Sequence, residues 1–451
     1  MAAQPIVIVS NRGPVSFDVR DGEIVERRGG GGLVAGLGSL GDGGGTQWIA
    51  AALSEGDREV AAKGTRSASG FEVTLLDIDP ETYRLAYDVV SNETLWFLHH
   101  GLFDPSRTPA FDDAWRAAWA AYRTVNEAFA EAVCERAPQG AEILVQDYHL
   151  SLLGRMLRER RRDLRTTHFH HTPFCSADEA RVLPGDVRRE LMEGLAGFDA
   201  CGFHTTEWSD RFRDAISSSG EQVPSTFVSP LAVDAEELTE RAGRDDVSAQ
   251  VDRLAGLVGG RQFVVRVDRI ELSKNLLRGF EAFDLLLRRR PELAERVVFG
   301  AFCYPSREGV EAYARYHADV ASRVDRLLAD WGPVVIWEDD DDYARSLAAL
   351  RLADVVVVNP VRDGLNLVAK EATLVNERWT SVVLSERAGV AEELGEHCDV
   401  VNPFDVSATA DAMARGLERS AEDRESRGRA RLEVARRRQP SDWLDEQLRS
   451  R

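Results

Sequence analysis

The chain has 451 residues, which is too long for one ordinary domain and suits two or three. Hydrophobic residues make up 43% of it and charged residues 29%, so a sizeable core inside a soluble protein is expected. Acidic residues outnumber basic ones by 76 to 56, a formal net charge of −20. General nucleic-acid binders and proteins that bind anionic membranes need a basic surface, so this balance argues against both classes.

The cysteines and the first residues predict a cytoplasmic protein. The five cysteines are scattered, odd in number and lack a C-x-x-C pair, so neither a disulfide framework nor a zinc site is expected. The start, MAAQPIVIVSNRG, lacks the basic segment of a signal peptide, and no apolar run approaches the roughly 20 residues of a membrane helix. We expect small-molecule substrates and no nucleic-acid or membrane partner. A homo-oligomer is compatible with the sequence, which does not fix the oligomeric state.

Short apolar runs rich in Val and Ile alternate with stretches whose apolar residues recur at helical spacing. The strand-like runs are Ile6–Val9, Ile143–Val145, Thr167–His171, Ala200–Phe203, Phe263–Val267, Val297–Phe302, Val334–Trp337, Val355–Val358 and Ser381–Leu384. The helical stretches include Trp115–Cys134, Leu276–Arg290 and Ala344–Leu352. This alternation predicts parallel sheets covered by helices on both faces.

The series of elements breaks near Val228–Asp234, which leads into the acidic, polar stretch Glu236–Asp252. We therefore expect an α/β fold of two doubly wound, Rossmann-like domains that face a central cleft. Residues 1–230 would form the first domain and residues 231–431 the second. A helix at about 432–451, anchored by Trp443 and Leu444, would pack back on the first domain. Ligands of such sheets bind at the carboxyl ends of the strands.

A glycine-rich run, Gly29–Gly32, follows the first strand and precedes an apolar stretch. Backbone N–H groups at the start of a helix point at bound anions, and glycine allows a close approach, so the run suits a phosphate. A flexible surface loop is the alternative, because the run matches neither G-x-G-x-x-G nor a P-loop.

Two later strands end in polar residues that suit acid–base chemistry. Asp147 follows the strand Ile143–Val145, and His170 and His171 end the next one. A single buried histidine is more often a satisfied core residue than a catalytic group. A histidine pair at one strand end, with a carboxylate at an earlier strand end, moves the balance modestly towards function.

The second half places two cations in one loop after the strand Phe263–Val267. Arg269 and Lys274 can clamp a diphosphate there, although an exposed loop with ion pairs to Asp268 and Glu271 is the alternative.

A second loop with candidate functional residues follows Val355–Val358. Gly364 opens a turn before a helix, and Asp363 and Glu371 lie about two helical turns apart, so both can accept hydrogen bonds from hydroxyls in one cleft. This arrangement suits a sugar nucleotide. The alternative is a helix start with ordinary surface charges.

Taken together, these motifs resemble those of the trehalose-6-phosphate synthase family, retaining glycosyltransferases of the two-domain GT-B fold. The likeness runs through nearly the whole chain. It includes VSNRGPV at Val9–Val15, GGL at Gly31–Leu33, QDYHL at Gln146–Leu150, HHTPF at His170–Phe174, YPSR at Tyr304–Arg307 and, most specific, RDGLNLVAKE at Arg362–Glu371. The sequence departs from the family pattern at Gln146, at Asn275, at Ala51 and at Phe97–Gly101.

The resemblance implies a role for each matching residue. Arg269 and Lys274 would hold the donor diphosphate, with Gly32 beside the phosphate. The transferred glucose and its phosphate would be held by Asp363, Gly364, Leu365, Asn366 and Leu367. Glu371 would bind the ribose. Asp147 and His171 would act near the anomeric centre. Arg12, Tyr87, Trp96 and Arg307 would bind the acceptor, with Asp147 shared. Asp147, His171, Arg269 and Lys274 form the expected catalytic set.

The implied reaction joins glucose from a nucleoside-diphosphate glucose to glucose 6-phosphate, giving α,α-trehalose 6-phosphate. Two alternatives are a pseudo-glycosyltransferase of the validoxylamine-phosphate synthase type and a catalytically silent homologue. Neither a cofactor nor a metal is expected, because the cations supply the positive charge. The acidic run Glu338–Asp342 resembles a metal motif only superficially, and a solvated loop is the commoner case. A carboxylate of this run could accept both guanine donors, so GDP-glucose is favoured over UDP-glucose.

Overall fold

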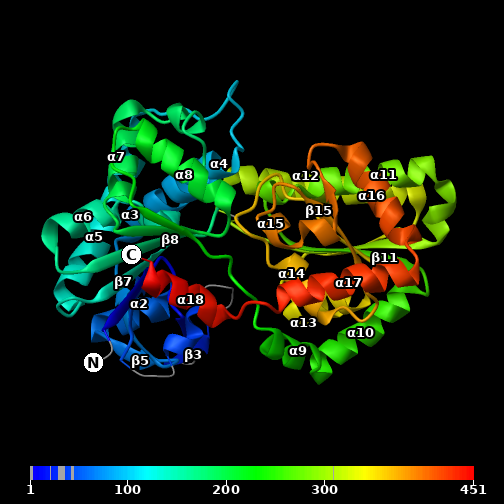
Figure 1. Cartoon of the computed structure of the whole chain (residues 1–451), viewed down its shortest axis with the longest axis horizontal. Coiled ribbons are helices and arrows are strands. Elements are labelled where there is room, and N and C mark those ends of the chain that lie inside the picture. Colours follow the sequence, from blue (N-terminus) through cyan, green and yellow to red (C-terminus); the bar gives the residue numbers. More distant parts are fainter. Residues whose placement is uncertain (1–3, 21, 29–35, 42–44, 308, 451) are drawn as a thin grey trace. The chain divides into compact units, whose positions relative to one another are not determined.

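The computed structural model describes residues 4–20, 22–28, 36–41, 45–307 and 309–450. The chain divides into two units, which we call unit 1 (Met1–Leu231 with Pro440–Arg451) and unit 2 (Ala232–Gln439). The expected boundary at residue 230 lies next to this division. The last helix, α18 (Pro440–Arg449), begins later than expected, because α17 (Ala421–Ala435) continues past residue 432 (Figure 1).

Unit 1 is built on an eight-stranded sheet in the order β10-β9-β8-β7-β1-β4-β6-β5. Every neighbouring pair is parallel except β5 and β6. The strands are β1 (Ile6–Ser10), β4 (Gln47–Ala51), β5 (Arg66–Ala68), β6 (Phe71–Leu76), β7 (Glu142–Gln146), β8 (Arg165–His170), β9 (Ala200–Phe203) and β10 (Ser225–Val228), and β2 (Val15–Arg20) and β3 (Glu23–Arg28) form a separate hairpin.

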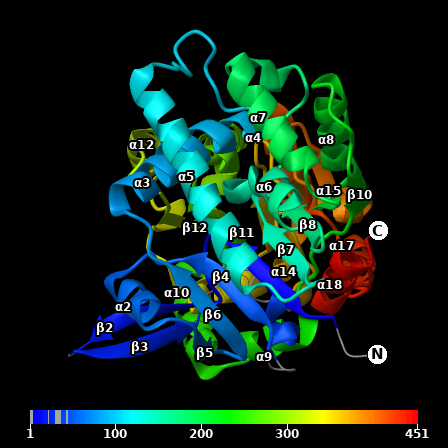
Figure 2. The ribbon, with the colours of Figure 1, turned by 90° about the vertical axis from the view of Figure 1, so that its left-hand side faces the viewer.

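Helices connect these strands, as parallel pairing requires. They are α2 (Glu55–Lys63), α3 (Pro80–Arg84), the π-helix η2 (Leu85–Leu95), α4 (Trp96–His100), α5 (Asp113–Arg136), α6 (Leu153–Arg160), α7 (Gly185–Ala196) and α8 (Thr206–Ser218). Figure 2 shows the long helix α5 with α6 beside it. The carboxylate of Asp112 accepts from the N–H of Trp115 and so caps the start of α5.

Unit 2 contains a six-stranded, fully parallel sheet in the order β13-β12-β11-β14-β15-β16. Its strands are β11 (Gln262–Ile270), β12 (Val297–Pro305), β13 (Val335–Glu338), β14 (Val355–Val358), β15 (Ser381–Ser385) and β16 (Asp399–Val401). Its helices are α9 (Ala235–Ala242), α10 (Asp245–Val258), α11 (Leu276–Arg289), α12 (Glu311–Trp331), α13 (Tyr343–Leu352), α14 (Val368–Val375), α15 (Ala391–Leu394), α16 (Val406–Glu418) and α17.

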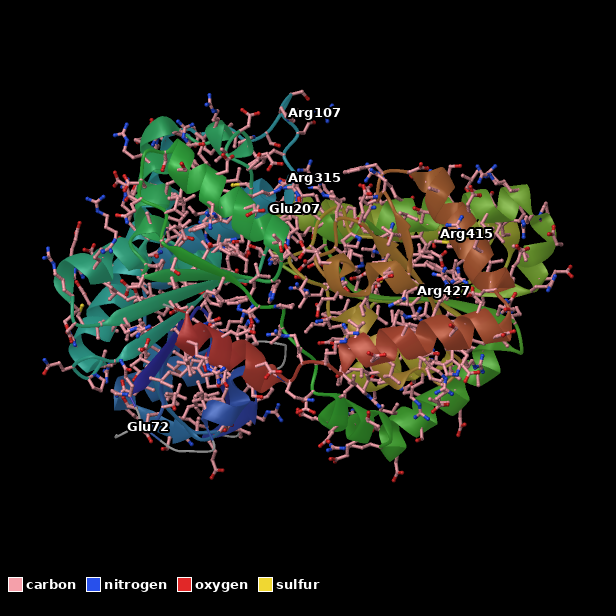
Figure 3. The ribbon with its side chains drawn as sticks, in the orientation of Figure 1. Glu72, Arg107, Glu207, Arg315, Arg415 and Arg427 are labelled. Atoms are coloured by element: carbon pink, nitrogen blue, oxygen red, sulfur yellow. The ribbon has the colours of Figure 1, made fainter. Side chains whose placement is uncertain are left out.

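Burial explains why these segments become strands. All four valines of β14 are buried, and β7 is buried along its whole length, as expected of central parallel strands covered on both faces. Charged residues lie outside: in Figure 3, Arg107 lies on an exposed loop of unit 1 and Arg415 on the exposed side of α16. The predicted fold class, two doubly wound Rossmann-like sheets, is confirmed.

Within the residues described, no helix combines the length and the apolar character needed to cross a membrane.

Unit 1 buries two histidines on β8. His168 and His170 are 0% and 1% exposed, and their rings approach to 3.5 Å between Nε2 of His168 and Nδ1 of His170. Burial lowers the pKa of His168 from its ordinary 6.5 to about 3, and lowers the pKa of His170 well below its ordinary value. Both rings are therefore neutral in the folded protein over a pH range in which the unfolded chain binds protons.

This difference predicts a loss of stability in mild acid. As the pH falls below 6.5, the unfolded state gains protons that the folded state excludes, so the free energy of unfolding should drop by about 1.4 kcal/mol per pH unit for each histidine. Urea unfolding between roughly pH 5 and 6.5 measures this slope. His168→Leu should make the slope shallower. An unchanged slope in His168→Leu would contradict the assignment.

Candidate functional site

Both sheets reverse their strand order at one point, and the predicted site residues follow the strands at these points. In unit 1, β1 has β7 on one side and β4 on the other; in unit 2, β11 lies between β12 and β14. The connections leave such a point in opposite directions, so the carboxyl ends of the strands open a crevice there, which is where ligands bind in doubly wound sheets. Each unit therefore has its own candidate half-site.

Asp147 and His171 are brought together in unit 1. Asp147 follows β7 with a φ of 70°, in the left-handed region, and its Oδ1 accepts from the backbone N–H of His171 at 3.2 Å. Nε2 of His171 lies 3.0 Å from Oε1 of Gln146, at the end of β7. Burial lowers the pKa of His171 to about 3, so the ring is neutral and cannot serve as a cationic acid near neutral pH.

Arg12 and Tyr87 are also brought together, across 75 residues of sequence. Nη2 of Arg12 donates to the hydroxyl of Tyr87 at 3.3 Å. Tyr87 stacks on Tyr83 on one side and on His149 on the other, with ring centroids 5.5 and 5.7 Å apart. The sequence reasoning missed these two neighbours, although the spacing of four between Tyr83 and Tyr87 was a signal that both share one helix face.

Trp96 begins α4 directly after the π-helix η2 and is 6% exposed. Its ring stacks on His100 at 3.9 Å between centroids, and His100 Nδ1 lies 2.8 Å from the carbonyl oxygen of Trp96. π-helical segments are rare and are frequent at functional sites. The departure at Phe97–Gly101 thus supplies a partner that fixes the Trp96 ring.

In unit 2 a buried ion network joins the ends of β11 and β14. Nζ of Lys274 lies 2.6 Å from Oδ2 of Asp363 and 3.7 Å from Oδ1 of Asp268. Arg266, 0% exposed, donates to Asp268 at 3.0 Å and to Asn359 at 2.7 Å, and also bonds the carbonyl oxygen of Lys274.

The second cation, Arg269, lies in β11 rather than in a loop, because the strand continues to Ile270 instead of ending at Val267 as predicted. It has its own buried partner. Nη1 of Arg269 lies 2.9 Å from Oε1 of Glu271, which is 0% exposed and also contacts Arg307 at 3.2 Å. Burial would raise the pKa of Glu271, but Arg269 and Arg307 outweigh it and lower the pKa to about 2. Burial would likewise lower the pKa of Lys274, yet Asp363 and Asp268 hold it above its ordinary value. Near neutral pH, Glu271 is therefore negatively charged and Lys274 positively charged.

The turn after β14 leads into α14. Asn366 has a φ of 76° and donates through Nδ2 to Asp363 at 3.1 Å, and the backbone of Asp363 bridges to Ala388. α14 begins at Val368, so Gly364–Leu367 immediately precede its first turn. Glu371 lies in its first turn, and burial raises its pKa to about 7.

Arg307 lies in unit 2, where its Nη1 donates to the hydroxyl of Tyr313 at 2.9 Å and contacts Glu271, whereas Arg12 and Tyr87 lie in unit 1. Its role at the acceptor stays a prediction. Gly32 lies outside the described residues.

The acidic run at the end of β13 is largely occupied by cations. Glu338 accepts from Arg253 at 2.8 and 2.9 Å and from Arg345 at 2.8 Å, and Arg345 also contacts Asp340. Asp342 caps α13 by accepting from the N–H of Arg345. In the described part of the chain, no group of three or more His, Cys, Asp or Glu side chains has a geometry for a metal ion.

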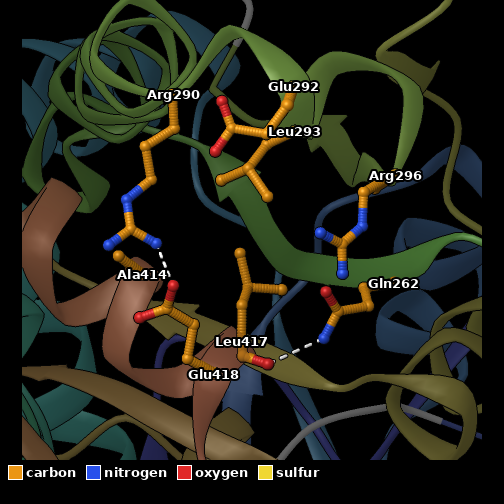
Figure 4. Close-up of a pocket in the computed structure, with 8 residues that line it drawn as sticks. All are labelled: Gln262, Arg290, Glu292, Leu293, Arg296, Ala414, Leu417 and Glu418. Atoms are coloured by element: carbon orange, nitrogen blue, oxygen red, sulfur yellow. Dashed lines mark hydrogen bonds and ion pairs between the residues drawn. The ribbon is translucent and has the colours of Figure 1, made fainter.

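A pocket of about 270 Å³ lies elsewhere in unit 2 (Figure 4). It is lined by Gln262, Arg290, Glu292, Leu293, Arg296, Ala414, Leu417 and Glu418. Gln262 begins β11, whereas the ion network follows the end of that strand. The pocket therefore lies at the amino ends of the strands, whereas the candidate site lies at their carboxyl ends.

Comparison with known proteins agrees with this geometry. The model of glycosyltransferase family 20 matches residues 4–450. The chain is 32% identical to the bifunctional trehalose-6-phosphate synthase/phosphatase of Thermoproteus tenax over 97% of its own length, but spans only 62% of that relative. It is 31% identical to the UDP-forming alpha,alpha-trehalose-phosphate synthase of Emericella nidulans, covering 93% of the chain and 86% of the relative.

A solved structure is similar as well. It is a UDP-forming alpha,alpha-trehalose-phosphate synthase from Burkholderia xenovorans in complex with glucose-6-phosphate, with a TM-score of 0.84 and 25% identity over 98% of this chain and 99% of that one. Because the family model spans nearly the whole sequence, the chain belongs to glycosyltransferase family 20.

Proposed function

We propose that this protein transfers glucose from a nucleoside-diphosphate glucose to glucose 6-phosphate, with retention, and so makes α,α-trehalose 6-phosphate. The observation that carries the proposal is the pair of cations at the carboxyl end of β11, with Arg269 in the strand and Lys274 just after it, at the point where the strand order of unit 2 reverses. Supporting it, the named relatives are trehalose-phosphate synthases.

The chemistry follows from charge. As the glycosidic C–O bond of the donor breaks, negative charge grows on the departing diphosphate and positive charge on the sugar ring. Arg269 and Lys274 neutralise the diphosphate, together with the N–H groups that begin α14. Arg269 pairs with Glu271 and Lys274 with Asp363, and these fixed positions support a site that needs little reorganisation when the substrate binds. The acceptor hydroxyl attacks the same face, and the departing phosphate oxygen takes its proton.

Unit 1 supplies the acceptor half-site. Arg12 provides a planar, permanently charged fork for the phosphate monoester of glucose 6-phosphate, and Tyr87 holds that guanidinium in place. Asp147 and His171 offer acceptors for sugar hydroxyls close together.

We propose UDP-glucose as the donor in place of GDP-glucose. The expectation of guanine depended on free carboxylates in Glu338–Asp342. Glu338 and Asp340 instead pair with Arg345, and Asp342 caps a helix, so these three carboxylates already have partners in the structure. Two of the similar proteins named above, from Emericella nidulans and Burkholderia xenovorans, are UDP-forming.

A donor panel tests both statements. UDP-, GDP- and ADP-glucose are each offered with glucose 6-phosphate, and nucleotide release and disaccharide phosphate are both quantified. We expect one product, α,α-trehalose 6-phosphate, and the highest kcat/KM with UDP-glucose. A higher kcat/KM for GDP-glucose would restore the guanine hypothesis, and nucleotide release without disaccharide would overturn the transferase assignment.

Arg269 and Lys274 give a prediction for turnover. Arg269→Ala and Lys274→Gln should each lower kcat on the order of 100-fold, because charge on the leaving diphosphate is left uncompensated. Lys274→Gln keeps a hydrogen-bond donor for Asp363 and so protects the fold. The matched control is Arg289→Ala on α11, which breaks an exposed ion pair with Asp411. Near-normal turnover in both site variants would remove the diphosphate assignment.

Glu371 gives a prediction for pH. With its pKa near 7, it is protonated in mild acid and ionised above, and only the ionised form accepts from both ribose hydroxyls. UDP affinity should therefore strengthen from about pH 6 to pH 8, since binding favours the ionised carboxylate. Titration calorimetry of the wild type against Glu371→Gln isolates this effect from the titration of the nucleotide itself. Identical pH profiles would show that Glu371 does not contact the ligand.

The acceptor assignment predicts a selective defect. Arg12→Ala should raise the KM for glucose 6-phosphate roughly 10-fold or more, the cost of one charged hydrogen-bonding group, and leave the Kd of UDP unchanged. Arg20→Ala, on the exposed hairpin, should change neither value. If Arg12→Ala weakened UDP and glucose 6-phosphate equally, Arg12 would not be an acceptor residue.

A further inference from the structure

The C-terminal helix α18 lies against β8, the strand that His171 directly follows. Its Trp443 is 0% exposed, and the indole ring packs edge-to-face on Phe169 at 5.0 Å and lies 5.6 Å from the His171 ring. A Cβ on Gly36 would come within 2.9 Å of the Trp443 ring, so the helix is closely seated. In Figure 1 the red helix α18 lies among the blue and green elements of unit 1, to which it belongs.

One side chain of α18 reaches the candidate site through a row of hydrogen bonds. Nε2 of Gln146 donates to Oε1 of Gln447 at 3.1 Å, and Oε1 of Gln146 accepts from Nε2 of His171 at 3.0 Å. Both glutamines are 1% exposed, so water does not compete for these bonds. The carbonyl oxygen of Gln447 also accepts from the hydroxyl of Thr167 at 3.5 Å, which holds the helix turn on β8.

The row has a direction, because an amide donates only through nitrogen and accepts only through oxygen. Gln447 turns its Oε1 towards Gln146 and leaves its own buried Nε2 without a hydrogen-bond partner among the described residues, so Gln146 turns its nitrogen towards α18 and its oxygen towards the imidazole. A neutral imidazole has one N–H, and this arrangement places it on Nε2. Nδ1 of His171 is then an acceptor, and it has no hydrogen-bond partner among the described residues.

We propose that Gln447 is a positioning residue that acts through Gln146 to keep His171 in the Nε2–H form, with Nδ1 ready to accept a sugar hydroxyl. The identity of that hydroxyl rests on the proposed function; the direction of the row does not. Without the acceptor at position 447, the nitrogen of Gln146 loses the hydrogen bond that holds the amide in this orientation. If it turns over, its nitrogen faces Nε2 and the proton moves to Nδ1, which then rejects the hydroxyl proton.

Nitrogen NMR of the protein labelled with ¹⁵N-histidine tests the tautomer without any substrate, with the His171 signals assigned from a His171→Gln sample. We expect two well-separated ring-nitrogen signals for wild-type His171, with the proton on Nε2. Gln447→Met, which removes the acceptor at similar size, should bring the two signals towards each other. Gln447→Glu, which keeps an oxygen acceptor, should retain the wild-type pattern. A wild-type proton on Nδ1, or an unchanged pattern in Gln447→Met, would overturn the proposal.

Steady-state kinetics then tests the consequence. Gln447→Met should lower kcat about three- to tenfold, the value of one hydrogen bond, and Gln447→Glu should recover most of it. Leu444→Ala is the control, because it removes a buried contact of α18 outside the row and should lower the melting temperature with little change in kcat. Equal losses of kcat in Leu444→Ala and Gln447→Met would mean that α18 only supports the fold. A correct tautomer in a protein that forms no disaccharide would overturn the proposed function alone.

Discussion

The buried charges at the end of β11 are the constraint on which the unit 2 half-site depends. Burying an unpaired ion costs several kcal/mol, so Arg266, Asp268, Lys274 and Asp363 are stable there only as a group. Their pairing joins two loops that are far apart in sequence. Even Gly279 fits this view, because a Cβ at that position would come within 2.5 Å of Nη1 of Arg266. The same pairing holds Lys274 in place, and Glu271 holds Arg269, the second cation proposed to bind the diphosphate.

The half-site of unit 1 is organised differently. Stacked rings flank Tyr87, and the amide of Gln146 is hydrogen-bonded to the ring of His171. This contrast matches the chemistry proposed for each half-site. A leaving diphosphate needs fixed positive charge, whereas an incoming sugar needs oriented acceptors and one phosphate contact.

Much of the framework could be read from the sequence, since continuous Val- and Ile-rich runs in parallel sheets are distinctive. Ala200–Phe203 and Val355–Val358 are strands with the predicted bounds. The strands β4 and β6 and the hairpin of β2 and β3 were missed, because their mixed composition resembles that of loops. The π-helix η2 has no sequence signature in its spacing, so it was also missed.

The candidate site was predictable where the residues lie close in sequence, and less so where partners come from far away. The acidic run was visible, but Arg253, which lies 85 residues before Glu338, was not recognisable as its partner. Asn275 departs from the family pattern, yet its φ of 61° is one that asparagine tolerates. Its side chain also bonds the carbonyl oxygens of Asn359 and Pro403. Gln447 could not be linked to His171 until the fold showed where α18 packs.

The central claim is that Arg269 and Lys274, at the carboxyl end of β11, bind the donor diphosphate. A crystal structure of the protein with an unreactive nucleoside-diphosphate glucose tests it most directly. The account predicts that diphosphate oxygens lie within hydrogen-bond distance of Arg269 and Lys274, and that the sugar lies beside Asp363. A nucleotide bound instead in the pocket lined by Gln262 and Arg290, with the Lys274–Asp363 pair untouched, would contradict it.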